Sequence, residues 1–210
     1  MSEPLMQSPL HQFGLAAEAK SVEGRKGVWA NEVPILGYIS LRGNARDEAF
    51  VSAASYVLGV KLPAEPCTLA VSATAKVLWL SPDEWMIMCP RARLGALLRD
   101  LDQALAGIRS QVADNSGGYT QVVVLGRSAH DVMSHASVYD LAALAPGRVV
   151  GTTFGKSSLY VHRQDEGFCL VLRRSFADYI WRYLVRAAQP YGFGVARLEA
   201  DGLGLRRDAA

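Results

Sequence analysis

The chain contains one stretch of sequence twice, in two diverged copies that lie 82 residues apart. The first copy reads VLWLSPDEWMIMCPRARLGALLRDLDQAL, and the second reads LYVHRQDEGFCLVLRRSFADYIWRYLVRAA. When the copies are superposed, Asp83 aligns with Asp165 and Glu84 aligns with Glu166. An earlier pair of segments, containing Gly43 and Gly126, repeats at nearly the same spacing. A period this long indicates one supersecondary unit used twice about a pseudo-twofold axis, not a solenoid.

Both halves predict the same order of elements from their hydrophobic periodicity. The first half predicts a strand over 34–41, a helix that ends at Gly59, strands over 74–80 and 85–89, and a leucine-striped helix over 91–106. The second half predicts strands over 120–126, 149–155, 157–163 and 168–174, helices over 129–137 and 176–188, and a last strand over 193–200. The expected fold class is therefore α+β, with two pseudo-twofold-related β-α-β-β-α repeats of antiparallel sheet and packed helices.

Local signals set the expected element boundaries. Asn44, Ser128 and Ser175 are the expected N-caps of three helices, since their side chains can accept from the first free backbone N–H groups. The segment Ser-Pro-Asp-Glu at 81–84 suits a type I turn, because proline fixes φ at its second position. Gln189-Pro190 is expected to end the last helix.

The repeats imply a domain organisation. Residues 1–32 show no sustained period beyond a short helix near Leu15–Lys20, so we expect an extended N-terminal arm. Ordering such an arm costs entropy, which favours an arm that lies along a partner. The first repeat is expected over 33–113 and the second over 114–200, together forming one compact domain. Residues 201–210 are expected to be a loose tail.

Composition excludes several classes of protein. The net charge is +2 and Lys and Arg are scattered among Asp and Glu, which predicts no nucleic-acid partner. No apolar stretch approaches the ~20 residues of a membrane-spanning helix, and the first residues lack a signal peptide pattern. The three cysteines, Cys67, Cys89 and Cys169, form no CxxC motif, which is typical of reduced cytosolic proteins. We expect a soluble, cytoplasmic protein without membrane contact.

The repeated carboxylate pairs are candidate acid/base groups. Asp83 and Glu84, like Asp165 and Glu166, fall in predicted hairpin turns, where Asp is favoured for backbone reasons. Adjacent side chains on a turn diverge, so we interpret both pairs as turn residues and not as a catalytic acid and base.

The histidines do not form a metal-binding pattern. His130 and His135 are five residues apart on a predicted helix, so their rings point in different directions. No HExxH motif occurs, and neither His11 nor His162 has a carboxylate or cysteine at a suitable spacing.

Two glycine-containing segments, 116–118 and 151–155, invite comparison with phosphate-binding loops. Neither contains GxGxxG, and GKSS at 155–158 matches only the end of a Walker A motif, because Val150 replaces its first glycine. A strand, not a helix, is expected to follow. No GxSxG nucleophile elbow occurs around Ser116. We therefore assign no catalytic, cofactor-binding or metal-binding residue.

Two tryptophans fall outside the expected core. Trp29 lies in the arm, and Trp181 lies off the apolar stripe expected for the last helix. That stripe consists of Phe176, Tyr179, Ile180 and Tyr183. Tryptophans outside a core stripe are typical interface anchors, so we expect both to lie under a partner chain.

The segments DNSGGYTQVVVLGRSA, VLWLSPDEWMIMCP and FCLVLRRSFADYIWRYL resemble the gamma subunit family of heterotetrameric sarcosine oxidase over nearly the whole chain. The second half is also similar to the glycine-cleavage T-protein (aminomethyltransferase) family. There, a D-x-S segment leads into a strand that ends in glycine, as Asp114, Ser116 and Gly126 do here.

The resemblance implies a subunit that joins alpha, beta and delta subunits in an oxidase. Such oxidases convert sarcosine, tetrahydrofolate and oxygen to glycine, 5,10-methylenetetrahydrofolate and hydrogen peroxide. The resemblance also implies that FAD, FMN, NAD and tetrahydrofolate are held by the other subunits. This chain would then bind no cofactor and carry no catalytic residue.

One departure from the T-protein pattern bears on folate chemistry. T-proteins carry Gly-Gly-x-x-Asp-Asp before the strand with their catalytic aspartate, whereas this chain has GKSSL at 155–159, without a carboxylate. The favoured hypothesis is thus a non-catalytic structural subunit of a flavin-dependent oxidase. A folate-binding module that uses the cleft between the repeats is the first alternative, and a stand-alone α+β ligand-binding module is the second.

Overall fold

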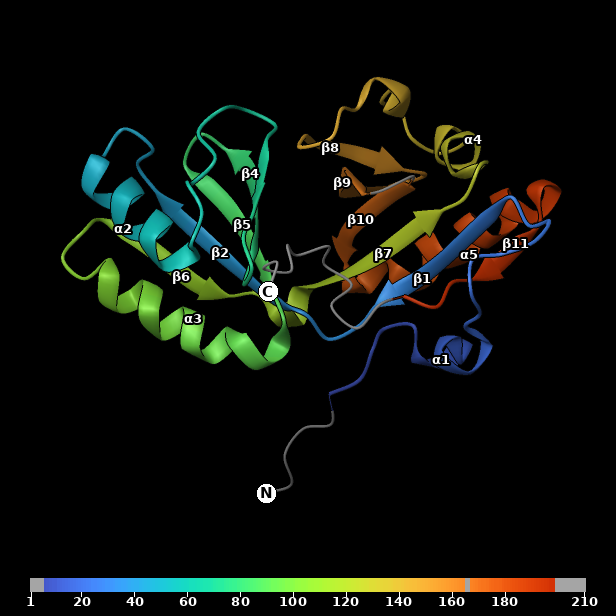
Figure 1. Cartoon of the computed structure of the whole chain (residues 1–210), viewed down its shortest axis with the longest axis horizontal. Helices are drawn as coiled ribbons and strands as arrows, with labels where there is room; N and C mark the ends of the chain where they lie inside the picture. Colours follow the sequence, from blue (N-terminus) through green and yellow to red (C-terminus); the bar gives the residue numbers. More distant parts are fainter. Residues whose placement is uncertain (1–5, 165–166, 199–210) are drawn as a thin grey trace. The chain divides into compact units, whose positions relative to one another are not determined.

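In a computed structural model of the chain, which describes residues 6–164 and 167–198, the polypeptide forms two compact units (Figure 1). The middle unit comprises Leu36–Gly117 with the short segment Gly147–Val149. The terminal unit comprises the described residues up to Ile35, Gly118–Pro146, and the described residues from Val150 onward. Each unit has its own sheet and its own hydrophobic core, where the sequence predicted a single compact domain.

The middle unit contains a five-stranded antiparallel sheet in the order β3-β4-β5-β2-β6. Its strands are β2 (Gly37–Gly43), β3 (Leu69–Val71), β4 (Lys76–Ser81), β5 (Glu84–Cys89) and β6 (Ser110–Asp114). Two helices, α2 (Glu48–Leu58) and α3 (Arg91–Ala104), lie along one face of this sheet (Figure 1). That face is apolar because strand side chains alternate, so every second residue points at the helices. The residues that fill this core include Ile39, Leu41, Phe50, Leu58, Trp85, Ile87, Leu94, Leu97 and Leu101.

The ends of α2 follow from local chemistry. Asp47 caps its start by accepting hydrogen bonds from the N–H groups of Ala49 and Phe50 at 3.0 and 3.3 Å. Asn44, the predicted cap, instead accepts from the N–H of Arg46, so that prediction is wrong by one turn. The helix ends at Gly59 in the left-handed conformation (φ 64°), as predicted.

The terminal unit contains a six-stranded sheet in the order β11-β1-β7-β10-β9-β8. The strands are β1 (Val28–Val33), β7 (Tyr119–Leu125), β8 (Val149–Phe154), β9 (Ser157–Gln164), β10 (Gly167–Arg173) and β11 (Phe193–Val195). The central pairings are antiparallel, and β11 joins β1 in parallel. The helices of this unit are α1 (Leu15–Glu18), α4 (Ala129–Ser134) and α5 (Ala177–Ala188). Short 3₁₀ turns complete the chain at His11–Phe13, Ser116–Gly118, Leu141–Ala143, Arg174–Phe176 and Gln189–Tyr191.

The element order confirms the predicted duplication and the α+β class. The middle unit runs β2-α2-β3-β4-β5-α3-β6, and the terminal unit runs β7-α4-β8-β9-β10-α5-β11 after β1. The four strands β3-β4-β5-β2 and β8-β9-β10-β7 also follow the same order within their sheets. The units differ where β1 lies between β7 and β11, which adds one strand to the terminal sheet.

The prediction of an extended N-terminal arm over 1–32 is wrong for the described residues of that range. All six residues of β1 are buried, and the strand pairs with β7 on one side and β11 on the other. A strand covered on both faces needs no alternation of polar and apolar residues, so VWANEV gave no periodic signal. Trp29 is therefore buried by its own chain, with 4% of its surface exposed.

Helix α5 is also turned differently from the prediction. Trp181 is 3% exposed, and its ring lies 6.1 Å from Phe13 and 5.7 Å from Phe193, measured between ring centroids. Phe176, which was expected in the core, precedes the helix and is 44% exposed. The buried face is Ala177, Ile180, Trp181, Leu184 and Ala188. Neither tryptophan is available as an anchor for a partner chain, so that expectation is wrong.

Candidate functional site

Of the repeated carboxylates, Asp83 lies in a hairpin turn, as predicted, whereas Glu84 is the first residue of β5. Asp83 accepts a hydrogen bond from the Ser81 hydroxyl at 2.7 Å, in the turn between β4 and β5. Glu84 forms an ion pair with Arg42 at 2.9 Å on the neighbouring strand. Their aligned partners at 165 and 166 lie outside the described residues. Each member of the pair at 83–84 thus has an ordinary structural partner.

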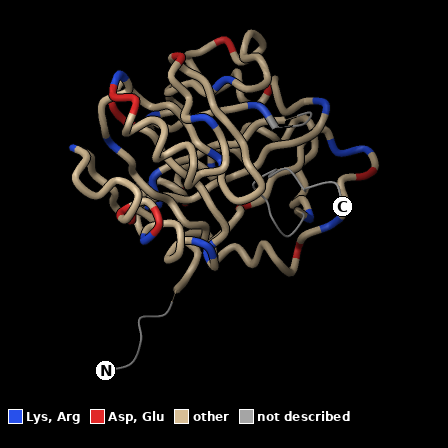
Figure 2. Tube along the Cα trace, turned by 60° about the vertical axis from the view of Figure 1, so that its left-hand side comes forward, with Lys and Arg blue, Asp and Glu red and all other residues tan. Residues whose placement is uncertain are grey.

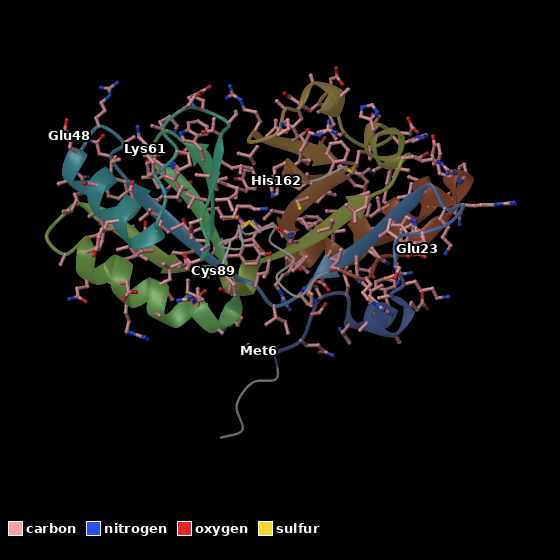
Figure 3. The ribbon with its side chains drawn as sticks, in the orientation of Figure 1. Met6, Glu23, Glu48, Lys61, Cys89 and His162 are labelled. Atoms are coloured by element: carbon pink, nitrogen blue, oxygen red, sulfur yellow. The ribbon has the colours of Figure 1, made fainter. Side chains whose placement is uncertain are left out.

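The histidines lie apart from one another. The His11 ring contacts the Ser8 carbonyl, and the His135 ring lies 3.4 Å from the Tyr191 hydroxyl. His162 is fully buried on β9 (Figure 3), with Nδ1 3.1 Å from the carbonyl of the next residue. Within the described ranges, no three side chains of His, Cys, Asp or Glu come together to form a metal site.

One buried carboxylate was missed by the sequence analysis. Glu32 on β1 is 6% exposed, and it accepts a hydrogen bond from the Thr120 hydroxyl at 2.5 Å and another from the Ser8 hydroxyl. The adjacent Asn31 donates to the carbonyl of Ala196 at 2.7 Å. Both oxygens of the carboxylate hold hydroxyl donors of the same chain, so the group fastens the N-terminal segment to β7. No local pattern links these positions, because Ser8 and Thr120 lie 24 and 88 residues from Glu32.

The segments compared with T-proteins have structural roles. Ser116 donates to Asp114 at 2.5 Å and accepts from the N–H of Tyr38 at 3.0 Å, which braces the end of β6 against β2. Gly155 (φ 60°) and Lys156 form the turn between β8 and β9, so the strand predicted after them is confirmed. The N–H of Lys156 donates to the hydroxyl of Tyr179 at 3.0 Å. This N–H therefore does not point into a phosphate-binding loop.

A groove of about 620 Å³ lies over the sheet of the terminal unit. Strands β7, β8, β9 and β10 and the loop after α4 each contribute to its walls. The lining residues are Tyr119, Val138, Tyr139, Gly151, Thr152, Thr153, Ser158, Leu159, Tyr160, Val171 and Arg173. Because these residues come from separate segments of sequence, no motif marked the groove in advance.

Among the described residues that line the groove, there is no His, Asp, Glu, Lys or Cys side chain beside the hydroxyl groups. Its lining holds three tyrosines and one arginine, with the Arg173 guanidinium 4.6 Å from the ring centroid of Tyr119. At its rim, Val138 is 84% exposed and Tyr139 is 40% exposed. Tyrosine and arginine are enriched at the centres of protein–protein interfaces, where large side chains meet a partner. We take this groove as the candidate functional site.

Elsewhere the surface is mixed in charge. Lys and Arg are interspersed with Asp and Glu along the described trace, with no run of one sign longer than two residues (Figure 2). No helix in the described part of the chain is long and apolar enough to cross a membrane.

Comparison with known proteins assigns the chain to a family. A sequence model described as "Sarcosine oxidase, gamma subunit family" matches residues 42–189, which is more than half of the chain. The chain belongs to this family. The gamma subunit family match extends from the end of β2 to the end of α5, so it spans most of both units.

Individual relatives agree with this assignment. A sarcosine oxidase subunit gamma from an Arthrobacter species is 30% identical over 181 residues, which is 83% of this chain and 85% of the relative. A heterotetrameric sarcosine oxidase from a Corynebacterium species, solved with pyrrole 2-carboxylate, contains a chain with a TM-score of 0.80 and 26% identity. The match covers 93% of this gamma-family chain and 100% of that one.

The T-protein resemblance holds at the level of fold. The glycine cleavage system aminomethyltransferase T from Bartonella henselae matches with a TM-score of 0.68 and 14% identity. The match covers 91% of this chain but only 60% of the aminomethyltransferase. The gamma-family chain therefore shares an architecture with part of that enzyme.

Proposed function

We propose that this chain is the non-catalytic, structural gamma subunit of a heterotetrameric sarcosine oxidase. The proposal depends on the structural match to the Corynebacterium chain, which covers 100% of that chain with a TM-score of 0.80. The matched part covers 93% of this chain. The groove of the terminal unit supports the proposal, because its tyrosines and arginine suit contact with another protein.

The partners in this proposal are the alpha, beta and delta subunits. FAD, FMN, NAD and tetrahydrofolate bind to those subunits and not to this chain. The assembled enzyme oxidises the methyl group of sarcosine by two electrons and transfers its carbon to tetrahydrofolate. Glycine and 5,10-methylenetetrahydrofolate are released, and the two electrons reduce oxygen to hydrogen peroxide. The gamma chain stabilises the assembly in which these steps occur.

We also infer that the chain works in the cytoplasm. All three cysteines are free thiols in the structure, and Cys67 is exposed to solvent. An exposed free thiol persists in a reducing compartment and is oxidised outside it. The inference is tested by fractionating cells, and recovery of the chain in an extracytoplasmic fraction would contradict it.

The experiment that tests the structural role compares the oxidase expressed with and without this chain. With the chain present, we expect all four subunits to copurify and the flavin absorbance to follow the large subunits. Without it, we expect the remaining subunits to dissociate or lose thermal stability, because a subunit that binds only the folded assembly stabilises it by mass action. A fully stable and active oxidase that lacks the chain would contradict the proposal.

The folate-binding alternative has its own readout. The isolated chain is melted with increasing concentrations of a tetrahydrofolate analogue. A bound ligand stabilises the chain by about 2.7 kcal/mol at a hundredfold excess over Kd. An unchanged melting temperature at high ligand concentration supports the structural role, and a saturable increase supports folate binding.

A further inference from the structure

We propose that the groove of the terminal unit binds an extended segment of a partner subunit, and that this segment carries a carboxylate next to an apolar side chain. The inference rests on the proposed function, because it requires that the chain assembles with other subunits. It adds which surface of the chain is occupied and what chemistry occupies it.

The charge of the groove indicates that the bound segment carries a carboxylate. Arg173 is exposed at the groove, and the described part of the chain contributes no Asp or Glu to the lining. Three arginines of the described structure, Arg42, Arg148 and Arg182, form ion pairs with carboxylates at 2.7–2.9 Å. Arg173 has a ring contact with Tyr119 but no such ion pair within the described residues. Its planar guanidinium is thus oriented by an aromatic ring and suited to bidentate contact with a carboxylate.

The rim of the groove indicates that an apolar side chain lies next to this carboxylate in the bound segment. Val138 exposes 84% of its surface although its loop is held in place. The Ser137 hydroxyl lies 3.3 Å from the Thr152 hydroxyl on β8, and the N–H of Gly155 donates to the carbonyl of Ala136 at 2.9 Å. An exposed apolar side chain on a fixed loop loses little conformational entropy when a partner covers it.

The polar groups of the walls favour an extended polypeptide. Gly151 is exposed on β8, and the polar residues Thr153 and Ser158 also line the groove. Peptide groups of an extended segment need such donors and acceptors when they leave water. A small ligand on the sheet would leave Val138 at the rim in solvent, whereas a segment that crosses the rim covers it.

The same charge disfavours a second copy of this chain as the occupant. In a twofold-symmetric contact each groove would face an identical groove. Because the lining offers Arg173 and no carboxylate, such a contact would bring like charges together. A groove-on-groove contact therefore lacks the complementary charge, which in this proposal a partner subunit supplies.

The test uses the complete oxidase, assembled around tagged partner subunits. The variants are Arg173→Glu and Val138→Asp, and the matched control is Arg99→Glu, an exposed arginine on α3 of the middle unit. We expect each groove variant to raise the dissociation constant of the gamma chain at least tenfold, and the control to change it less than twofold. Melting of each isolated variant verifies that the chain is folded. Groove variants that bind like the parent, or no worse than Arg99→Glu, would overturn the inference.

A photo-crosslinking amino acid at position 139 identifies the occupant directly. We expect crosslinks to a partner peptide that contains Asp or Glu beside an apolar residue. Crosslinks between two copies of this chain, or to partner peptides without an acidic residue, would overturn the inference while the structural role stands. A parent chain that does not assemble with oxidase subunits at all would instead contradict the proposed function.

Discussion

Gly43 and Gly126 are aligned in the two repeats, Gly43 as the last residue of β2 and Gly126 directly after β7, and both lie where a side chain has no room. A Cβ atom on Gly43 would fall 2.3 Å from the ring of Phe50, which packs from α2. A Cβ atom on Gly126 would fall 2.5 Å from the carbonyl oxygen of Gly27, and its φ is 104°. Glycine thus avoids a different close contact at each place, one with a ring and one with backbone.

We predict that Gly126→Ala lowers the free energy of unfolding by about 3 kcal/mol, because a strained φ adds to a clash with backbone that cannot rotate away. Gly107→Ala is the matched control, since Gly107 also has a positive φ (80°) but no atom within 4 Å of its added Cβ. The control should cost about 1 kcal/mol. Urea denaturation measures both, and equal losses would show that the Gly27 carbonyl moves aside freely.

Cys89 shows how burial alters a titrating group. The residue ends β5 with none of its surface exposed (Figure 3). Burial is the largest cause that raises the pKa of the thiol from its ordinary 9.0 to about 11. The negative charge of Asp114 raises it further, and Arg91 partly opposes both. The folded state therefore holds the thiol proton more tightly than the unfolded state.

We predict that stability falls with pH between about 9 and about 11. A pKa raised by folding contributes stability that is complete below the unfolded value and is lost as the pH rises toward the folded value. Cys89→Ala should flatten this dependence in urea titrations at pH 8 to 11.

In the native protein at pH 8, a thiol reagent should modify exposed Cys67 rapidly and buried Cys89 only on unfolding. Rapid modification of Cys89 would contradict the burial.

Among the elements, α5 shows where helical periodicity misleads. Aromatic residues lie on several sides of this helix, so more than one apolar stripe fits the sequence. The structure places Trp181 inward because Phe13 and Phe193, from opposite ends of the chain, surround its ring. Phe176 is left outside because it belongs to the 3₁₀ turn before the helix. The orientation is therefore set by partners that the helix sequence does not contain.

We predict that Trp181→Ala lowers the free energy of unfolding by about 4 kcal/mol, because it leaves a cavity between two rings in the core. Phe176→Ala removes an aromatic side chain that is 44% exposed and should cost less than about 1 kcal/mol. Thermal and urea unfolding of both variants tests the assignment of the buried face. A larger loss of stability for Phe176→Ala than for Trp181→Ala would instead support the apolar stripe predicted from sequence.

At the scale of the whole molecule, the terminal unit is closed by both ends of the described chain. Strand β1 pairs with β7 and β11, and Leu10, Leu15 and Val28 add to the same core. Glu32 fastens this segment from within by accepting from Ser8 and Thr120. The N-terminal segment is thus part of a folded unit and not an appendage.

We predict that a fragment of residues 118–198 alone shows no cooperative melt, since β7 and β11 each lose the strand between them. Adding a peptide of residues 6–35 should restore secondary structure and a melting transition, measured by circular dichroism. A peptide with Glu32→Ala should restore less, because the Thr120 hydroxyl then lacks its acceptor. A sharp melt of the fragment alone would contradict the role of β1.

The sequence by itself determined the features that depend on neighbours along the chain. The β4–β5 hairpin follows from Pro82 and Asp83, the inward face of α3 from its leucines, and the duplicated element order from hydrophobic period. The family resemblance follows from the same segments. Tertiary structure alone decided the place of β1, the phase of α5, the Glu32 hydrogen bonds and the groove around Arg173. Each depends on side chains that are distant in sequence, and only closing the sheet brings them within contact distance.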